Sequence, residues 1–184
     1  MLIRSYKYRL YPNKETAQQL QWVLDRCREL YNASLSERKD AWKYARKSIN
    51  YYDQQNDLPE IKQIREEYKD IAAHVLQNVL RRVDLAFRRF FERVKNGERA
   101  GFPRFKGPNQ YNSITYPDHK GWKLKENKLH FAKIGTAKVV LHRPIAGKIK
   151  TLTVKREADQ WYVVFACEVL QPEPLPISCQ LPHS

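Results

Sequence analysis

The spacing of the apolar residues, which changes twice along the chain, is the feature that most constrains this fold. Residues 2–10 alternate between apolar and polar side chains as a half-buried strand does, and this period of two returns from Tyr111 to Leu170. Between these segments, apolar residues recur every three to four positions, which is typical of amphipathic helices. The pattern therefore predicts an α+β fold, in which a small antiparallel β-barrel is interrupted by a helical domain.

Proline, glycine and capping residues set the expected boundaries. The first strand of the barrel covers residues 1–12, the helical domain residues 13–108 and the remainder of the barrel residues 109–171. Residues 172–184 contain four prolines, which favours a linker or a disordered tail.

Within the helical domain we expect three helices of unequal strength. Asn13 is a suitable N-cap for a long helix that ends before the polar stretch Tyr51–Leu58. A short helix is expected around Pro59–Tyr68, and the strongest helix over Ile71–Lys95, ending at Asn96-Gly97.

The helix over Ile71–Lys95 has two contrasting faces. One face carries apolar residues around Phe87, Phe90 and Phe91, which predicts that this face is buried. The opposite face carries arginines, whose planar guanidinium groups suit phosphate. Without matching carboxylates these arginines would repel one another unless an anion lay across them. They are Arg81, Arg82, Arg88, Arg89 and Arg93.

A turn rich in glycine and proline follows this helix, over residues 101–108. We expect Phe102 and Phe105 to anchor the turn to a core, while Arg104 and Lys106 point outward. Further on, Trp122–Leu124 and Leu129–Phe131 flank a polar segment and predict a hairpin.

The charge of the chain indicates a polyanionic partner. There are 34 Lys and Arg against 20 Asp and Glu, a net charge of +14. Residues 81–156 alone hold 20 basic and 5 acidic residues, whereas residues 157–184 hold 4 acidic residues and no Lys or Arg. A solvated face is the simpler interpretation of a charge run, but a surface of mixed sign would serve solubility equally well.

Aromatic residues alternate with cations in several places, as in Tyr6-Lys7-Tyr8-Arg9 and Trp122-Lys123. Aromatic rings can stack on unpaired bases while the cations follow the phosphate backbone, which weakly favours RNA or single strands over duplexes. We expect most of these rings to lie in the core.

The sequence gives no sign of catalysis. It contains no phosphate-binding glycine loop, no dinucleotide fingerprint and no nucleophile elbow, and its five histidines lack ligand spacing. We therefore predict no catalytic residue, no metal site and no cofactor. No apolar run approaches the ~18 residues of a membrane span, the chain begins without a signal-peptide stretch, and three isolated cysteines favour the cytosol.

Several motifs in a fixed order resemble a known family. The opening strand contains Tyr-Arg-Leu-Tyr-Pro-Asn at 8–13, and the first helix contains Leu30-Tyr31-Asn32-x-x-Leu35. The arginine helix contains Leu76-Gln77-x-x-Leu80 and Ala86-Phe87-x-x-Phe90-Phe91, followed by the turn Gly-Phe-Pro-Arg-Phe-Lys at 101–106 and by Trp161-Tyr162-Val163. Over roughly residues 1–172 the chain resembles the N-terminal half of TnpB (OrfB), a transposase-associated protein of insertion sequences.

This resemblance implies an RNA-guided DNA endonuclease family, related to type V CRISPR effectors. In that family a β-barrel wedge domain holds a guide RNA made from the transposon end, and a helical recognition domain lies along the guide–target heteroduplex. The partners implied are guide RNA and double-stranded target DNA, in a bacterial or archaeal cytoplasm near the nucleoid. Older naming calls the start of this region a helix-turn-helix domain.

The resemblance also implies roles for particular residues. The five arginines would contact the heteroduplex backbone, and Lys7, Arg9, Arg104 and Lys106 would contact RNA or the short motif adjacent to the target. Lys123 and Lys125, in the expected hairpin, complete the candidate nucleic-acid-binding residues.

The chain departs from the family after the barrel. The family continues into a RuvC-like nuclease domain with a Gly-x-Asp strand and a zinc ribbon, and neither has a counterpart here. We therefore expect a truncated module that binds but does not cut. Two alternatives remain: one half of a split nuclease completed in trans by a RuvC chain, or a basic RNA-associated structural protein.

Overall fold

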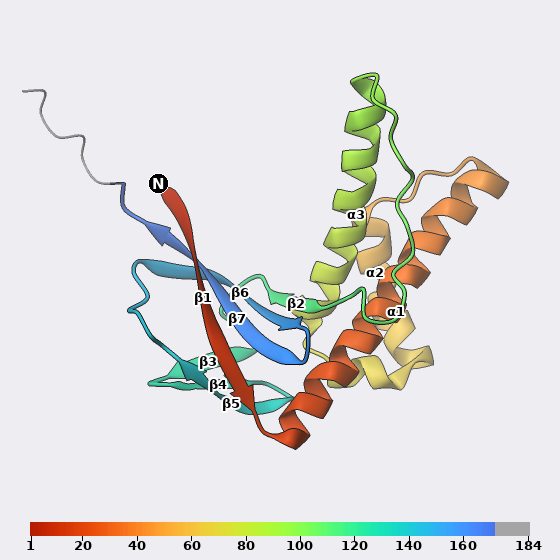
Figure 1. The fold of residues 1–184 in the computed structure, drawn as a ribbon. Coiled ribbons are helices and arrows are strands. Elements are labelled where there is room, and N and C mark those ends of the chain that lie inside the picture. The colour runs from red at the N-terminus through yellow and green to blue at the C-terminus, as the bar shows by residue number, and fades with distance from the viewer. Residues whose placement is uncertain (172–184) are drawn as a thin grey trace, which may run out of the picture.

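The computed structural model describes residues 1–171, so the expected tail over 172–184 lies outside the described residues. The helices fall between the first strand and all the others, as the period of the sequence predicts (Figure 1). In chain order the elements are β1 (Leu2–Pro12), α1 (Lys14–Ala45), α2 (Tyr51–Ile64), a 3-10 helix (Glu66–Asp70), α3 (Ala73–Lys95), β2 (Ser113–Tyr116), β3 (Trp122–Lys125), β4 (Lys128–Phe131), β5 (Gly135–Val140), β6 (Lys148–Glu157) and β7 (Gln160–Val169).

The strands form one antiparallel sheet in the order β2-β6-β7-β1-β5-β4-β3. The first strand lies in the middle of this sheet, because β1 pairs with β7 over most of its length and with β5 at its end. The sheet curls around its own core, since the ring of Tyr116 on β2 stacks on that of Phe131 on β4 with centroids 5.9 Å apart. The predicted barrel is thus confirmed, in the form of a half-barrel.

The two faces of the half-barrel differ sharply. Along β1, Tyr6, Tyr8 and Leu10 are buried, whereas Lys7 and Arg9 between them point the other way. We call the side of the sheet that carries Tyr6, Tyr8 and Leu10 the inner face and the other side the outer face. Because neighbours in an antiparallel register share a face, the strand pairings assign each paired residue to one of the two.

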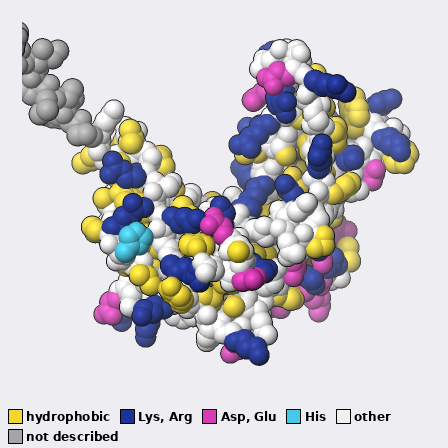
Figure 2. Space-filling view, in the orientation of Figure 1, with side chains coloured by type: hydrophobic (Ala, Val, Ile, Leu, Met, Phe, Trp, Pro, Cys, Tyr) yellow, Lys and Arg dark blue, Asp and Glu magenta, His cyan; other side chains and the backbone are white. Residues whose placement is uncertain are grey.

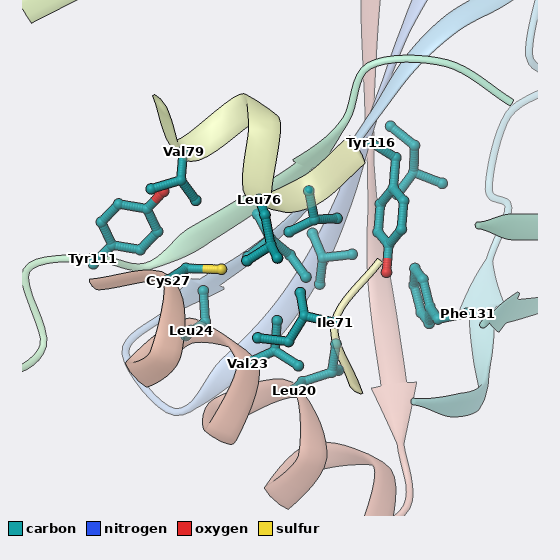
Figure 3. Close-up of a cluster of buried hydrophobic side chains, with 14 of the residues drawn as sticks. Leu20, Val23, Leu24, Cys27, Ile71, Leu76, Val79, Tyr111, Tyr116 and Phe131 are labelled. Atoms are coloured by element: carbon teal, nitrogen blue, oxygen red, sulfur yellow. The ribbon is translucent and has the colours of Figure 1, made fainter. Parts of the chain in front are cut away.

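The helices α1 and α3 close the inner face. Leu20, Val23, Leu24 and Cys27 of α1 point toward the side chains that α3 and the sheet contribute, and Figure 3 shows them in one cluster with Leu76. One continuous hydrophobic core therefore joins the helical part to the half-barrel.

The start of α1 follows its sequence signal. The Oδ1 atom of Asn13 accepts a hydrogen bond from the Thr16 backbone N–H at 2.8 Å, and Glu15 lies in the first turn, where the helix dipole favours an anion. The helix ends at Arg46, which adopts a left-handed conformation.

The expected boundary of the second helix is wrong. Helix α2 begins at Tyr51, within the stretch predicted to be non-helical, and Pro59 lies inside it. A capping box at Asn50 starts the helix, with Asp53 accepting from the Asn50 backbone N–H at 2.9 Å. Its buried residues, Tyr51, Gln54 and Leu58, follow a helical spacing that the polar composition of the segment obscures.

The expected burial of the phenylalanines of α3 and of the turn is only partly correct. Phe87 is buried, but Phe91 of α3 and both Phe102 and Phe105 of the turn are exposed. The turn is instead fixed by Asn32 of α1, whose side chain bonds both the backbone carbonyl and the backbone N–H of Lys106, at 2.9 and 2.8 Å.

We predict that Gly147→Ala destabilises the half-barrel by about 1–3 kcal/mol. Gly147 precedes β6 at φ +83°, and a Cβ atom there would lie 2.2 Å from the backbone carbonyl oxygen of Glu168. Urea unfolding followed by circular dichroism measures the loss. Gly101→Ala is the matched control, because nothing lies within 4 Å of its Cβ position, and an equal effect of both changes would contradict the prediction.

We also predict that the Cys27 thiol is inert in the native protein. Complete burial raises its pKa to about 12, so the reactive thiolate is scarce at neutral pH. Alkylation followed by mass spectrometry should label Cys27 only when denaturant is added; rapid labelling under native conditions would show that the core opens readily.

Candidate nucleic-acid interface

Arg82 connects α3 to the half-barrel. Its guanidinium donates to the backbone carbonyl of Ser113 at 2.8 Å and to Oγ1 of Thr115 at 2.9 Å, and its Nε donates to Asn78 within the helix. Ser113 and Thr115 alternate along β2 with buried Ile114 and therefore lie on the outer face. The arginine face of α3 thus continues directly onto the outer face of the sheet.

Three of the other four predicted arginines of α3 have partners, each of a different kind. The guanidinium of Arg81 lies 3.5 Å from the ring centroid of Tyr51, Arg88 pairs with Asp84 at 2.9 Å, and Arg93 pairs with Glu98 at 2.9 Å. The expectation that these side chains lack carboxylates is wrong for Arg88 and Arg93. Within residues 1–171, Arg89 is the one member of the five without a hydrogen bond, ion pair or ring contact.

Asp84 belongs to a network, centred on Arg38 of α1, that joins the three helices. Its carboxylate accepts from Arg38 of α1 at 3.1 Å, and Oε1 of Gln54 on α2 accepts from the Nε of Arg38 at 2.8 Å. Arg38 and Gln54 are both buried. Because a buried charge without its partner is costly, this network fixes how α1, α2 and α3 meet.

Three of the predicted residues meet in a hollow of about 330 Å³ between α3, the turn and the start of β2. Arg82, Arg89 and Lys106 line it, together with the amides of Gln110 and Asn112. Arg104 is exposed on the same turn but does not line this hollow. Figure 2 shows Lys and Arg side chains on both sides of the wider depression between the sheet and α3.

The pairing of the strands shows that the basic region around Arg82 continues across the outer face. Ser113 pairs with Lys155, Lys155 with Tyr162, and Tyr162 with Arg9, so one row runs from β2 through β6 and β7 to β1. Lys7, two residues before Arg9, lies on the same face. The candidate residues on β1 and on α3 are therefore parts of one surface.

Aromatic rings and a carboxylate hold the cations of β1 in place. The guanidinium of Arg9 lies 4.9 Å from the ring centroid of Tyr11 and 5.3 Å from that of Tyr162, and Lys7 lies 4.3 Å from Tyr162. Lys7 also pairs with Glu157 at 2.7 Å. Hydrogen bonds from Lys155 and Lys7 lower the pKa of the Glu157 carboxyl, which keeps it charged and ties up these two lysines.

A row of lysines crosses the other end of the outer face. Lys125 on β3 pairs in register with Lys128 on β4, which pairs with Lys138 on β5, and Lys138 pairs with Tyr11. We call Lys125, Lys128 and Lys138 the lysine row; Lys123 lies beside it on the same face. Like charges directly opposite one another destabilise a sheet, so this arrangement favours an external anion.

Sequence reasoning identified Lys125 but missed Lys128 and Lys138. Their alignment depends on strand pairing, which the local sequence does not reveal. The alternation along β4 shows which of its residues share a face: Lys128 with His130, and Leu129 with Phe131. It does not show which residues of other strands lie opposite them.

Among the described residues there is no group of three or more His, Cys, Asp or Glu side chains that could hold a metal ion. Within the same part of the chain, none of the helices is long and apolar enough to cross a membrane.

Known proteins are similar to this chain in sequence and in fold. Residues 1–47 match the family model of a helix-turn-helix domain of IS605 OrfB proteins, although these residues form β1 and a single long helix here. A protein of Streptomyces pristinaespiralis named as an RNA-guided DNA endonuclease is 28% identical over 178 residues, which are 93% of this chain and 43% of that protein.

A solved structure shares the fold. The cryo-EM structure of a Cas12f1–sgRNA–target DNA complex contains a chain that matches 94% of this one with a TM-score of 0.54 at 15% identity. The match covers 50% of that chain, so this protein spans about half the length of the relatives it matches.

These findings show that the chain is similar to part of a protein named as an RNA-guided DNA endonuclease and shares its fold with about half of a chain in the Cas12f1 complex. The match of residues 1–47 to the helix-turn-helix domain of IS605 OrfB proteins agrees with the resemblance to TnpB (OrfB) that the order of the motifs indicates.

We predict that Arg82 and Arg89 of α3 contribute differently to the stability of the fold. Arg82→Ala should lower the free energy of unfolding by about 2 kcal/mol, because it removes charged hydrogen bonds between α3 and β2. Arg89→Ala should change it by less than about 0.5 kcal/mol, because the side chain is exposed. Urea unfolding tests both variants, and equal losses would contradict the assignment of Arg82 as the bridge.

Proposed function

We propose that this chain binds a guide RNA and its target DNA, as the N-terminal module of a TnpB-like RNA-guided DNA endonuclease. The observation that carries the proposal is the continuity of the basic surface from Arg89 and Arg82 of α3 across the outer face to Arg9 and the lysine row. A relative named as an RNA-guided DNA endonuclease and a fold shared with a Cas12f1 chain support it.

The chemistry of this surface suits a nucleic-acid backbone. Lysines in the row present point charges to phosphates, whereas Arg9, held by cation–π contacts with Tyr11 and Tyr162, presents a planar guanidinium fork. Such contacts position a nucleic-acid duplex by its shape and charge, and base pairing between guide and target supplies the sequence specificity.

We assign the two parts of the chain different roles within this function. Residues 1–12 and 109–171 would serve as the wedge domain that holds guide RNA, and residues 13–108 as the recognition domain along the heteroduplex. The hollow lined by Arg82, Arg89 and Lys106 lies where these parts meet, and both parts would contact the nucleic acid there.

We further propose that the 184-residue chain binds guide RNA and target DNA without cutting the DNA. Incubation of the 184-residue chain with guide RNA, matching DNA and Mg²⁺ should leave the DNA intact. If cleavage occurs only when a separate RuvC-containing chain is added, the alternative of a nuclease completed in trans is correct. Cleavage by the chain alone would contradict the proposal.

We predict that the lysine row contributes most through phosphate contacts. Changing Lys125, Lys128 and Lys138 together to Gln should weaken binding to an RNA–DNA heteroduplex uniformly across sequences. It should also reduce the slope of log Kobs against log[salt] by about 3, or about 1 for each phosphate that a lysine no longer neutralises. Fluorescence anisotropy over a series of salt concentrations measures both quantities.

Lys62→Gln is the control for this series, because Lys62 lies in the last turn of α2, away from the outer face. The triple variant removes three charges and Lys62→Gln removes one. If Lys62→Gln reduces the slope by a third as much as the triple variant does, only net charge matters and the lysine row has no special role. Wild-type protein that fails to bind RNA or heteroduplex at moderate salt would overturn the proposed function itself, and would favour a structural role unrelated to guides.

A further inference from the structure

The helical part carries a second surface that differs from the basic outer face. A groove of about 780 Å³ lies between the C-terminal halves of α1 and α3 and the turn that follows α3. This volume is within the range of about 300–1,000 Å³ that is usual for ligand sites. We call it the aromatic groove, because the side chains that form it are mainly Phe87, Phe90, Phe91, Phe102, Phe105 and Trp42.

The rings of the aromatic groove are unusually accessible. Phe91 is 61% exposed, Trp42 55%, Phe105 48% and Phe102 41%. So many open rings around one concavity form the kind of patch that marks an interaction site on a small protein.

The rings are nevertheless held in a defined arrangement. Phe102 meets Phe87 and Phe90 edge to face, with centroids 5.4 and 5.1 Å apart, and Phe91 packs on Phe90 at 5.2 Å. Edge-to-face packing leaves part of each ring face free to stack on another planar group. The groove is thus preformed rather than collapsed.

The rim of the aromatic groove is positively charged. The Nζ atom of Lys39 lies 5.2 and 5.0 Å from the centroids of Phe102 and Phe105, and Lys43 and Lys47 continue the same wall. Asp40 is the one carboxylate among the lining residues, and it accepts a hydrogen bond from Ser36 at 3.2 Å. An occupant that presents negative charge beside planar rings fits this distribution best.

Two kinds of macromolecule could use accessible rings, and the charge decides between them. The centres of protein interfaces are depleted in lysine, whereas sites for single-stranded nucleic acid combine stacked aromatic rings with cations that follow the backbone. We propose that the aromatic groove binds the unpaired bases of a single-stranded nucleic-acid segment, with its phosphates against Lys39, Lys43 and Lys47. This inference rests on the proposed function, but it concerns a separate surface.

The experiment uses the full chain and a short uridine RNA, with an RNA–DNA heteroduplex as the second ligand. Ultraviolet cross-linking followed by mass spectrometry should place uridine on peptides that contain Trp42, Phe91, Phe102 or Phe105. Combining Phe91→Ala with Phe105→Ala should weaken uridine RNA binding about tenfold and leave heteroduplex binding unchanged. Neither ring belongs to the buried core, so the variant retains it.

Tyr44→Ala is the control. Tyr44 is an exposed ring on α1, the helix that carries Trp42, and Lys43 lies 4.9 Å from its centroid, but it does not line the groove. Unchanged uridine RNA affinity in the double variant would overturn the proposal, as would cross-links confined to the sheet. Self-association that the double variant abolishes, without an effect on RNA, would show that a second protein chain occupies the groove. Failure of the wild-type protein to bind the heteroduplex would instead refute the proposed function.

Discussion

The core between the inner face of the sheet and helices α1 and α3 is the interaction on which the rest of this structure depends. Side chains on a strand alternate, so burying Tyr6, Tyr8 and Leu10 forces Lys7 and Arg9 to the opposite side. Every strand paired with β1 inherits the same division, which is why cations far apart in sequence meet on one outer face. The hydrophobic effect thus arranges the charged surface without any attraction between its charges.

In the helical part, buried polar groups fix how the helices pack. Arg38, Gln54 and Asp84 connect three helices through hydrogen bonds that admit few alternative alignments, and Arg82 adds a link to β2. Some arginines of α3 are therefore structural as well as basic, and Arg89 remains open to solvent. A basic helix face is not a uniform binding surface, because each guanidinium that bonds the protein is less available to phosphate.

The fold was largely predictable, because its signals are local. The change of apolar period located the helices between β1 and β2, and the Asn13 cap fixed the start of α1. The start of helix α2 was placed too late because Pro59 suggested a boundary, although Tyr51, Gln54 and Leu58 already showed helical spacing. The lysine row could not be predicted in the same way. Its existence depends on the pairing of β3, β4 and β5, and register is a tertiary property.

The two proposed surfaces differ in the physics of binding, and that difference explains why one small chain would carry both. The outer face offers spaced cations, which suit the regular phosphates of a duplex and respond strongly to salt. The aromatic groove offers exposed rings such as Phe102 and Phe105, both beneath Lys39, which suit bases that are not already stacked in a helix. A guide RNA paired with its target has both kinds of region, duplex and unpaired. Binding both at once would fix the position of the duplex end along the protein, which backbone contacts alone leave free to slide.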